Sequence, residues 1–236
     1  QTVRAIRTDA AGRVYVGGSF PGWTNRPEGT YLVCLRTDGS IDPQFSASLN
    51  NTVNKLEIDA EGRLLVAGQF TNYQGAGYLI RLLADGTRDT TFNASQTATS
   101  SVPDMELQPD GKIVFLLGSN SVRRVLASGA VDSAFPTLNQ NGLSSLALQA
   151  DGRILVGGSF TSFAGFTRGG LVRLNTEGTV DSEFDTAGNT SVGVVRVDGY
   201  GRIWVGGNFT VFNNVLVRAI AVLNGDPVPL GFVTLP

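Results

Sequence analysis

The sequence predicts an all-β fold made of five copies of one module, and two repeated patterns carry this prediction. The first is a strand that opens with glycine and a basic residue, and its copies read GRVYVGGSF, GRLLVAGQF, GKIVFLLGS, GRILVGGSF and GRIWVGGNF. The second is Gly-x-x-Asp-x-x-Phe, in which the aspartates are Asp42, Asp89, Asp132 and Asp181. The opening glycines of the first pattern are 50, 49, 41 and 49 residues apart, a period typical of structural repeats that stack side by side.

Each module reads as four short strands separated by turns. The first strand, as in VNKLEID at 53–59, precedes an Asp-Gly type of turn, and the second is the glycine-opened segment. The third resembles YLVCLRT at 31–37, and the fourth carries Asp-x-x-Phe. No helical periodicity is visible, and small sheets repeated five times match radial stacking, which leaves only short protected edges. The sequence therefore predicts a five-bladed β-propeller with four antiparallel strands per blade; a linear solenoid is the alternative.

The modules divide the chain into consecutive blades. We expect one domain over residues 1–236, with blades at about 1–47, 48–95, 96–138, 139–187 and 188–236. The last copy is degenerate, as terminal repeats often are: Phe232 keeps its place, but Pro229 stands where aspartate is expected. Val3 begins an innermost strand and the final FVTLP supplies an outermost one, so every blade should be complete without exchange of strands between the termini.

The amino-acid composition argues against several classes of function. The net charge is −2, only 16% of residues are charged, and no basic run is present, which argues against a nucleic-acid partner. Histidine is absent and Cys34 is the single cysteine, so the commonest general base and any cysteine metal cluster are missing. No apolar stretch is long enough to span a membrane. We expect no cofactor, no metal, no membrane insertion and no enzymatic activity.

The modules resemble the bacterial delta-60 propeller repeats, whose pattern runs DGKILVGGSFT and then RLNxDGSLDxxF. The segment ADGRILVGGSFTSFAG followed by LVRLNTEGTVDSEF is a close match. The resemblance covers nearly the whole chain: blades one, two and four match closely, blade three lacks the FT loop, and blade five lacks the aspartate. It implies a bacterial protein that is secreted or attached to the cell surface, and it supplies no catalytic residues.

One rim of the predicted propeller carries uniformly tight turns, and the other carries long, variable loops at 21–30, 71–77 and 161–169. Variable loops on a rigid scaffold usually carry binding, and exposed rings there could stack on sugars. The candidate rings are Trp23, Tyr73, Phe163 and Phe166. Tyr73 and Phe163 recur at one offset and equally fit a structural corner, whereas Trp23 and Phe166 do not share that register.

The shortened third blade predicts a notch in the loop-bearing rim. Asn120, Arg123 and Arg124 would form its floor, and the loop ending at Gly77 and the loop at Phe166 would wall it. Such a concave site is the default place for a ligand. The alternative is a deletion that a surface loop tolerates.

Charged residues recur on the innermost strands, where they would face a central channel. They are Arg7, Glu57, Asp104, Glu106 and Arg196. We expect a paired network that closes the channel; the alternatives are a polar ligand or ion held by the three carboxylates, or carboxylate chemistry on a glycoside.

A basic residue also follows each opening glycine, which could make an anion-binding ring. Alternatively, each pairs with a carboxylate of its own turn, and the Asp-x-x-Phe aspartates act as acceptors in turns.

These observations predict a non-catalytic extracellular binding or display module that recognises a glycan or a surface protein. We expect a monomer, either complete or excised from a longer chain. The alternatives are a structural spacer in a larger adhesin-like protein and, with least support, a carbohydrate-active enzyme.

Overall fold

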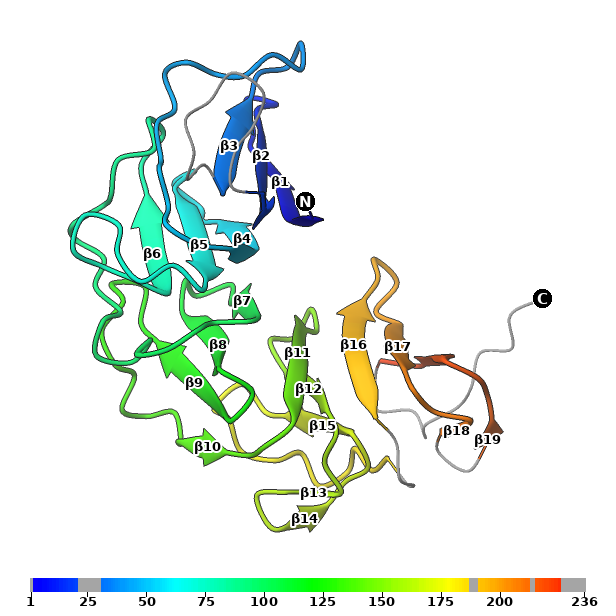
Figure 1. Cartoon of the computed structure of the whole chain (residues 1–236). Coiled ribbons are helices and arrows are strands. Elements are labelled where there is room, and N and C mark those ends of the chain that lie inside the picture. Colours follow the sequence, from blue (N-terminus) through cyan, green and yellow to red (C-terminus); the bar gives the residue numbers. More distant parts are fainter. Residues whose placement is uncertain (1, 21–30, 187–190, 213–214, 226–236) are drawn as a thin grey trace. The chain divides into compact units, whose positions relative to one another are not determined.

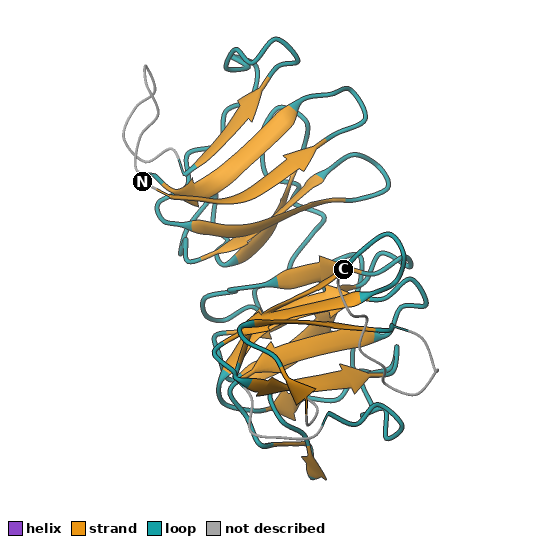
Figure 2. Cartoon of the chain, turned by 90° about the vertical axis from the view of Figure 1, so that its right-hand side faces the viewer, coloured by secondary structure: helices purple, strands orange, loops and turns teal. Residues whose placement is uncertain are grey.

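The described part of the chain is made of strands and loops. The computed structural model describes residues 2–20, 31–186, 191–212 and 215–225, and these ranges contain no helix (Figure 2). No segment in them therefore has the helical length and apolarity needed to span a bilayer. The strands in chain order are β1 (Thr2–Thr8), β2 (Val14–Ser19), β3 (Leu32–Leu35), β4 (Val53–Ile58), β5 (Leu64–Gly68), β6 (Leu79–Leu82), β7 (Met105–Leu107), β8 (Ile113–Leu117), β9 (Ser121–Val125), β10 (Leu138–Asn139), β11 (Leu143–Leu148), β12 (Ile154–Gly158), β13 (Ser162–Phe163), β14 (Phe166–Thr167), β15 (Leu171–Leu174), β16 (Val192–Val197), β17 (Ile203–Gly207), β18 (Val211–Phe212), β19 (Val215–Leu216) and β20 (Ile220–Leu223) (Figure 1).

The chain forms two compact units, each described here by itself. Unit 1 comprises Gln1–Leu117 and Arg124–Asp132, and unit 2 comprises Gly118–Arg123 and Ser133–Pro236. Unit 1 holds the antiparallel sheets β1-β2-β3 and β4-β5-β6, and unit 2 holds β11-β12-β15 and β16-β17-β20. The sheet β7-β8-β9-β10 contains the division between the units, which falls within β9. The all-β prediction is confirmed for the described residues.

The turn between the first and second strands of each repeat is built by an aspartate and a glycine. In the second repeat, the Gly62 N–H donates to the carbonyl of Asp59 at 2.9 Å, and Oδ1 of Asp59 accepts the N–H of Arg63 at 2.8 Å. Gly62 has φ of 78°, which glycine adopts at no steric cost. We name these turns the turn rim; they are residues 9–13, 59–63, 108–112, 149–153 and 198–202.

The segments that carry Asp-x-x-Phe pair with the sheets at single positions. The isolated bridges Leu35↔Ile41, Leu82↔Arg88, Val125↔Val131 and Leu174↔Val180 stand where a fourth strand was expected. The aspartate turns the chain out of the ladder; for example, Asp89 Oδ1 accepts the N–H of Thr91 at 2.9 Å. Of the repeat sheets in the described residues, only β7-β8-β9-β10 has four strands, so the expectation of four strands in every repeat is not confirmed there.

The phenylalanines of Asp-x-x-Phe lie buried between consecutive sheets. Phe92 packs with Leu65 of β5 and with Ile113 and Phe115 of β8. Phe45 and Phe184 occupy the same place in their repeats, with 1% and 2% exposure. Phe135 is also buried, and Phe232 lies outside the described residues. The phenylalanine of this motif is therefore buried in all four described copies.

The paired glycines of the second strands allow two close approaches. A Cβ on Gly17 would lie 2.5 Å from Cγ1 of Val53 in the next sheet, and one on Gly157 would lie 2.8 Å from Val192. The second glycine of each of these pairs lies opposite a β-bulge of the first strand, as Gly18 does at the bulge between Val3 and Ala5. In these two repeats the first glycine of the pair therefore allows the close approach of the next sheet, and the second lies at a bulge of its own sheet.

Consecutive repeats are also joined through backbone in unit 1. The N–H of Ser46 donates to the carbonyl of Asp85 at 2.9 Å, and the N–H of Asn93 donates to that of Ser128 at 3.0 Å. Gly86 and Gly129 follow these carbonyls, and a Cβ on either would clash with the backbone of Ser46 or Asn93. Each joint needs a glycine with positive φ, 88° at Gly86 and 83° at Gly129.

The N-terminal strand belongs to the first repeat. β1 pairs with β2, in the sheet that β3 completes. This agrees with the prediction that the termini do not exchange strands. The predicted final strand, FVTLP, lies outside the described residues.

Candidate functional site

The basic residue after each opening glycine is paired with a turn carboxylate. Nε of Arg13 lies 2.8 Å from Oδ2 of Asp9, and Nε of Arg63 lies 2.7 Å from Oδ2 of Asp59. Equivalent pairs join Lys112 to Asp110, Arg153 to Asp151 and Arg202 to Asp198. The interpretation of these residues as partners of turn carboxylates is confirmed, and the anion-binding ring is not supported.

A second set of arginines is buried on the third strands of repeats two to four. Nε of Arg81, Arg124 and Arg173 lies 2.7–2.8 Å from Oδ2 of the Asp-x-x-Phe aspartate eight residues later. Burial raises the pKa of Asp89, but hydrogen bonds from Thr91 and Arg81 outweigh it and hold that pKa below its ordinary value. These pairs were missed in the sequence, although the recurring Arg-x7-Asp spacing signals them.

Arg124 is therefore not the floor of an exposed notch. Its side chain is 2% exposed and bound to Asp132, and the same position holds a buried arginine in the repeats before and after it. Asn120 is exposed, and Arg123 is half-buried with its Nη2 3.5 Å from Oδ1 of Asn139. The predicted notch combines residues of both units, and for its remaining members it stays a prediction.

Two grooves open at the turn rim, one in each unit. The unit 1 groove, of about 500 Å³, lies between the turns of repeats two and three. Its walls include the carboxylates of Asp59, Glu61 and Asp110, and Arg81 and Gln108 are buried in it. Both of its arginines are engaged: Arg63 with Asp59 and Glu61, and Arg81 with Asp89 and the carbonyl of Ala127.

The unit 2 groove, of about 280 Å³, lies between the turns of repeats four and five. It is lined by Gln149, Ala150, Asp151, Tyr200, Gly201, Arg202, Asn224 and Gly225. Gln149 is buried and donates its Nε2 to the carbonyl of Gly225. Tyr200 is 88% exposed, so its ring stands at the mouth of the groove.

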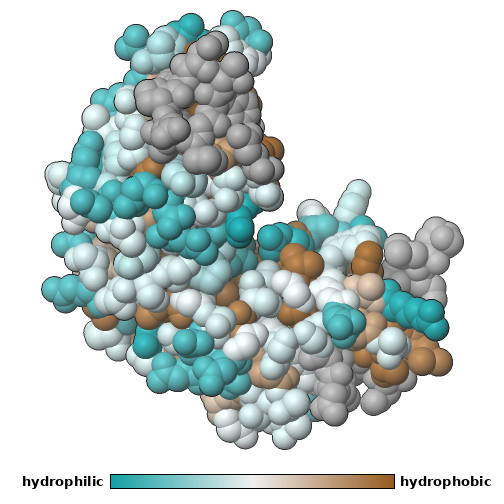
Figure 3. All heavy atoms as spheres, in the orientation of Figure 1, coloured by the Kyte–Doolittle hydropathy of each residue, from teal (hydrophilic) through white to brown (hydrophobic). Residues whose placement is uncertain are grey.

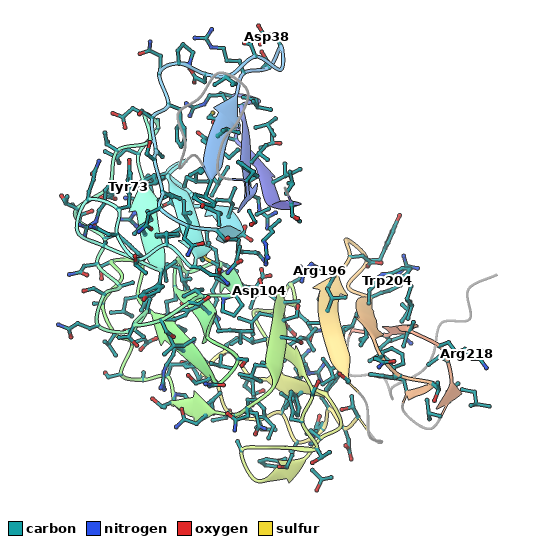
Figure 4. All side chains as sticks on the ribbon, viewed as in Figure 1. Asp38, Tyr73, Asp104, Arg196, Trp204 and Arg218 are labelled. Atoms are coloured by element: carbon teal, nitrogen blue, oxygen red, sulfur yellow. The ribbon has the colours of Figure 1, made fainter. Side chains whose placement is uncertain are left out.

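Tyr200, Arg202 and Trp204 form a stack at this groove. The guanidinium carbon of Arg202 lies 5.3 Å from the centre of the Tyr200 ring and 5.5 Å from that of Trp204, which projects from β17 (Figure 4). Oδ2 of Asp198 accepts the indole Nε1–H at 2.9 Å and the Nε–H of Arg202 at 2.7 Å. The hydrogen bond from Trp204, together with those from Arg202 and the backbone, lowers the pKa of Asp198 to about 2.

The inner strands of unit 1 hold a polar cluster centred on Lys55. Its Nζ lies 2.9 Å from Oδ1 of Asp104, which is labelled in Figure 4. The same Nζ lies 2.7 Å from Oε1 of Glu106, and Arg7 binds Glu57. Each of the three carboxylates thus has a cation beside it, with two cations facing three carboxylates, and this much of the expected pairing is present in unit 1. Lys55, two residues before Glu57 on the same strand, was missed by the sequence analysis.

The remaining charged residue of the inner strands, Arg196, lies in unit 2 and donates to the hydroxyl of Ser145 at 3.2 Å. Within the described ranges, no group of three metal-ligating side chains is gathered.

A family model for a β-propeller domain of unknown function (DUF5122) matches residues 12–45, 60–92 and 149–184. These segments belong to repeats one, two and four, whose motifs are the most regular. The chain is built from β-propeller repeats. No curated protein sequence matches it.

Solved propeller structures share this fold at low sequence identity. Virginiamycin B lyase from Staphylococcus aureus is 12% identical, with a TM-score of 0.60 over 99% of this chain and 70% of that one. The β-propeller domain of Cps50 (Swd1) from Myceliophteria thermophila is 13% identical, with a TM-score of 0.62 over 98% of this chain and 69% of that one.

A third similar structure is the extracellular domain of a B. thetaiotaomicron protein described as a hybrid two component system. It is 18% identical, with a TM-score of 0.59, and the match covers 88% of this chain. This chain spans only about a quarter, 26%, of that domain. At such identities these likenesses show the propeller fold and nothing more.

The loop aromatics of the propeller divide into packed and exposed rings. Tyr73 and Phe163 are 7% and 1% exposed, and Tyr73 donates its hydroxyl to the carbonyl of Gly86 at 2.8 Å (Figure 4). Both are structural corner residues, so neither offers a face to a ligand. Phe166 is 40% exposed at the tip of the β13-β14 hairpin, with the guanidinium of Arg168 5.5 Å from its ring. Trp23 lies outside the described residues.

The loop side of unit 2 also exposes aliphatic side chains. Leu216 and Ile220 are 84% and 60% exposed, and hydrophobic surface is visible over β18 and β19 (Figure 3). This surface belongs to the β18-β19 pair and the start of β20 and does not line either groove of the turn rim.

Proposed function

We propose that this chain is a non-catalytic binding module that takes a glycan in the unit 2 groove. The exposed ring of Tyr200 carries this proposal, because it stands over a groove with polar groups on its floor. Sugar binding needs an aromatic face for the apolar side of the pyranose and hydrogen-bonding groups for its hydroxyls. The unit 1 groove is larger but has no ring in its lining.

The carboxylates of the groove support binding and not catalysis. Asp198 accepts hydrogen bonds from Arg202 and Trp204 and has a pKa of about 2, so it is a poor proton donor or acceptor near neutral pH. Asp151 is bound by Arg153. A glycosidase pair needs one carboxyl kept protonated by its surroundings, and neither residue has such surroundings.

The architecture in this proposal is one five-bladed propeller, in which the Asp-x-x-Phe segment is the shortened fourth strand of each blade. We further propose an extracellular or cell-surface location in a bacterium. Its support is that similar propellers include extracellular domains of B. thetaiotaomicron proteins and that the modules resemble secreted repeats.

A glycan array on the purified chain, followed by calorimetry on any hit, tests the function. Tyr200→Ala should weaken binding at least about tenfold, since a central aromatic contact contributes about 2 kcal/mol. Its melting temperature should stay unchanged because the ring is 88% exposed.

Phe166→Ala is the matched control, since it removes an exposed ring of the same unit on the loop side. We expect it to bind as the wild type does. Loss of binding in Phe166→Ala with retention in Tyr200→Ala would move the site to the loop-bearing rim. An array with no hit would leave the spacer as the better description.

A further inference from the structure

Blade five differs from the others in what its turn arginine can reach. In blades one, two and four, a terminal nitrogen of this arginine approaches the Asp-x-x-Phe aspartate of its own blade. Nη1 lies 3.9 Å from Asp42 for Arg13, 3.9 Å from Asp89 for Arg63, and 3.5 Å from Asp181 for Arg153. Blade five has Pro229 at this place in the sequence, and among the described residues Arg202 has no such partner.

The terminal nitrogens of Arg202 are therefore not engaged by any described residue. Its Nε–H is bound to Asp198 at 2.7 Å, and across the residues that the structure describes its two Nη groups contact no acceptor. The side chain is 34% exposed and lines the unit 2 groove. The hydrogen bond to Asp198 and the flanking rings of Tyr200 and Trp204 fix the plane of the guanidinium.

A fixed guanidinium with two free donors on one edge matches a carboxylate, which accepts two parallel hydrogen bonds. The other groups of the groove suit the rest of a sugar. The ring of Tyr200 offers an apolar face, and the amide of Asn224, which makes no hydrogen bond to the described residues, lines the same groove and can bind a hydroxyl.

The acidic groups nearby do not repel such a ligand strongly. Asp151 is neutralised by Arg153, and Asp198 by Arg202 itself. The groove thus has a balanced charge, and selection for an anion must come from directed hydrogen bonds at short range.

We propose that the unit 2 groove is selective for a sugar that carries a carboxylate, a uronic acid or a related acidic sugar. Its carboxylate accepts hydrogen bonds from the Nη groups of Arg202, and its ring lies against Tyr200. This proposal rests on the proposed glycan-binding function and adds the class of the ligand.

The test compares methyl glucuronoside and methyl galacturonoside with the corresponding neutral glucoside and galactoside. Binding is followed by NMR at the indole Nε1–H of Trp204, which sits beside Arg202. The wild type should bind at least one uronoside about tenfold or more tightly than its neutral counterpart. Arg202→Lys should remove most of this preference, because lysine lacks the planar pair of donors.

Arg13→Lys in blade one is the control. It changes the equivalent turn arginine, whose Nη1 already donates to the carbonyl of Ala84 at 3.0 Å, and it should leave the preference intact. Melting curves of both variants show whether either substitution has lowered the thermal stability of the protein.

The outcomes separate the two proposals. Equal affinity for acidic and neutral sugars, with binding still dependent on Tyr200, would overturn the acidic-sugar assignment and leave the glycan function standing. No binding by any glycan would overturn both. A short peptide with a free C-terminal carboxylate that competes as well as the uronoside would show a carboxylate site that is not specific for sugars.

Discussion

At the scale of single residues, burial decides what a charged side chain does. Arg124 sits in a blade with short loops and looks, in the sequence, like an exposed binding residue. In the structure its side chain is 2% exposed and its Nε lies 2.7 Å from Asp132. A buried cation of this kind holds its partner aspartate, and removing it leaves an uncompensated buried charge.

Arg124→Ala should therefore lower the free energy of unfolding by about 3–5 kcal/mol, measured by chemical denaturation. The neighbouring Arg123→Ala, which removes a half-buried side chain without a buried ion pair, should cost much less. The double variant Arg124→Ala with Asp132→Ala should recover part of the loss. Equal effects of the two single substitutions would contradict the assignment.

The cluster around Lys55 gives a prediction of pH dependence. Burial raises the pKa of Glu106, although Lys55 lowers it, and Asp104 and Glu57 add to the rise. A carboxyl whose folded-state pKa is raised binds its proton more tightly in the folded state, so its contribution to stability is full below the unfolded-state pKa. That contribution is lost as the pH rises through the folded-state pKa.

Glu106→Gln keeps an uncharged polar side chain near Lys55 and removes this ionisation. The variant should be at least as stable as the wild type at pH 7. Its advantage should fall away as the pH approaches the ordinary pKa of a glutamate, 4.5. Urea denaturation of both proteins between pH 4 and pH 8 checks this, and a variant that is less stable at pH 7 but not at pH 4.5 would reverse the sign.

At the scale of elements, the phenylalanine of Asp-x-x-Phe joins one repeat to the next. Phe92 is 2% exposed and packs against strands of repeats two and three. Its position was predictable because the motif recurs at a fixed distance from the opening glycine. The shortening of the fourth strand to one bridge was not predictable, because the sequence of the motif is the same whether the strand continues or the aspartate turns the chain out of the sheet.

Phe92→Ala should cost about 3–5 kcal/mol of stability, since it empties a packed site between two sheets. Phe166→Ala, which removes the same side chain from an exposed hairpin tip, is the control and should change stability by less than about 1 kcal/mol. Differential scanning calorimetry of the two variants separates them, and similar melting temperatures would rule out the assigned role of Phe92.

At the scale of the whole chain, the repeat revealed the fold class, since period, turn chemistry and strand pattern all recur along the sequence. The candidate site was less predictable. The long loops indicated Tyr73 and Phe163, which are packed corners in the structure, whereas the grooves open between turns whose sequences are nearly uniform. The signals for the unit 2 groove were small departures from the repeat, namely Tyr200 in a turn that elsewhere has alanine or an acid and Pro229 in place of aspartate.

The joints between repeats have a consequence for how such a chain changes over generations. At Gly86 and Gly129 the contact consists of backbone atoms and a glycine, so it depends little on the other side chains of either copy. After a module is duplicated or deleted, each remaining copy can dock on whichever copy becomes its neighbour. Unequal recombination can then alter the number of copies. Mutation can also change a single turn, as in the fifth copy, without disturbing the joints between repeats.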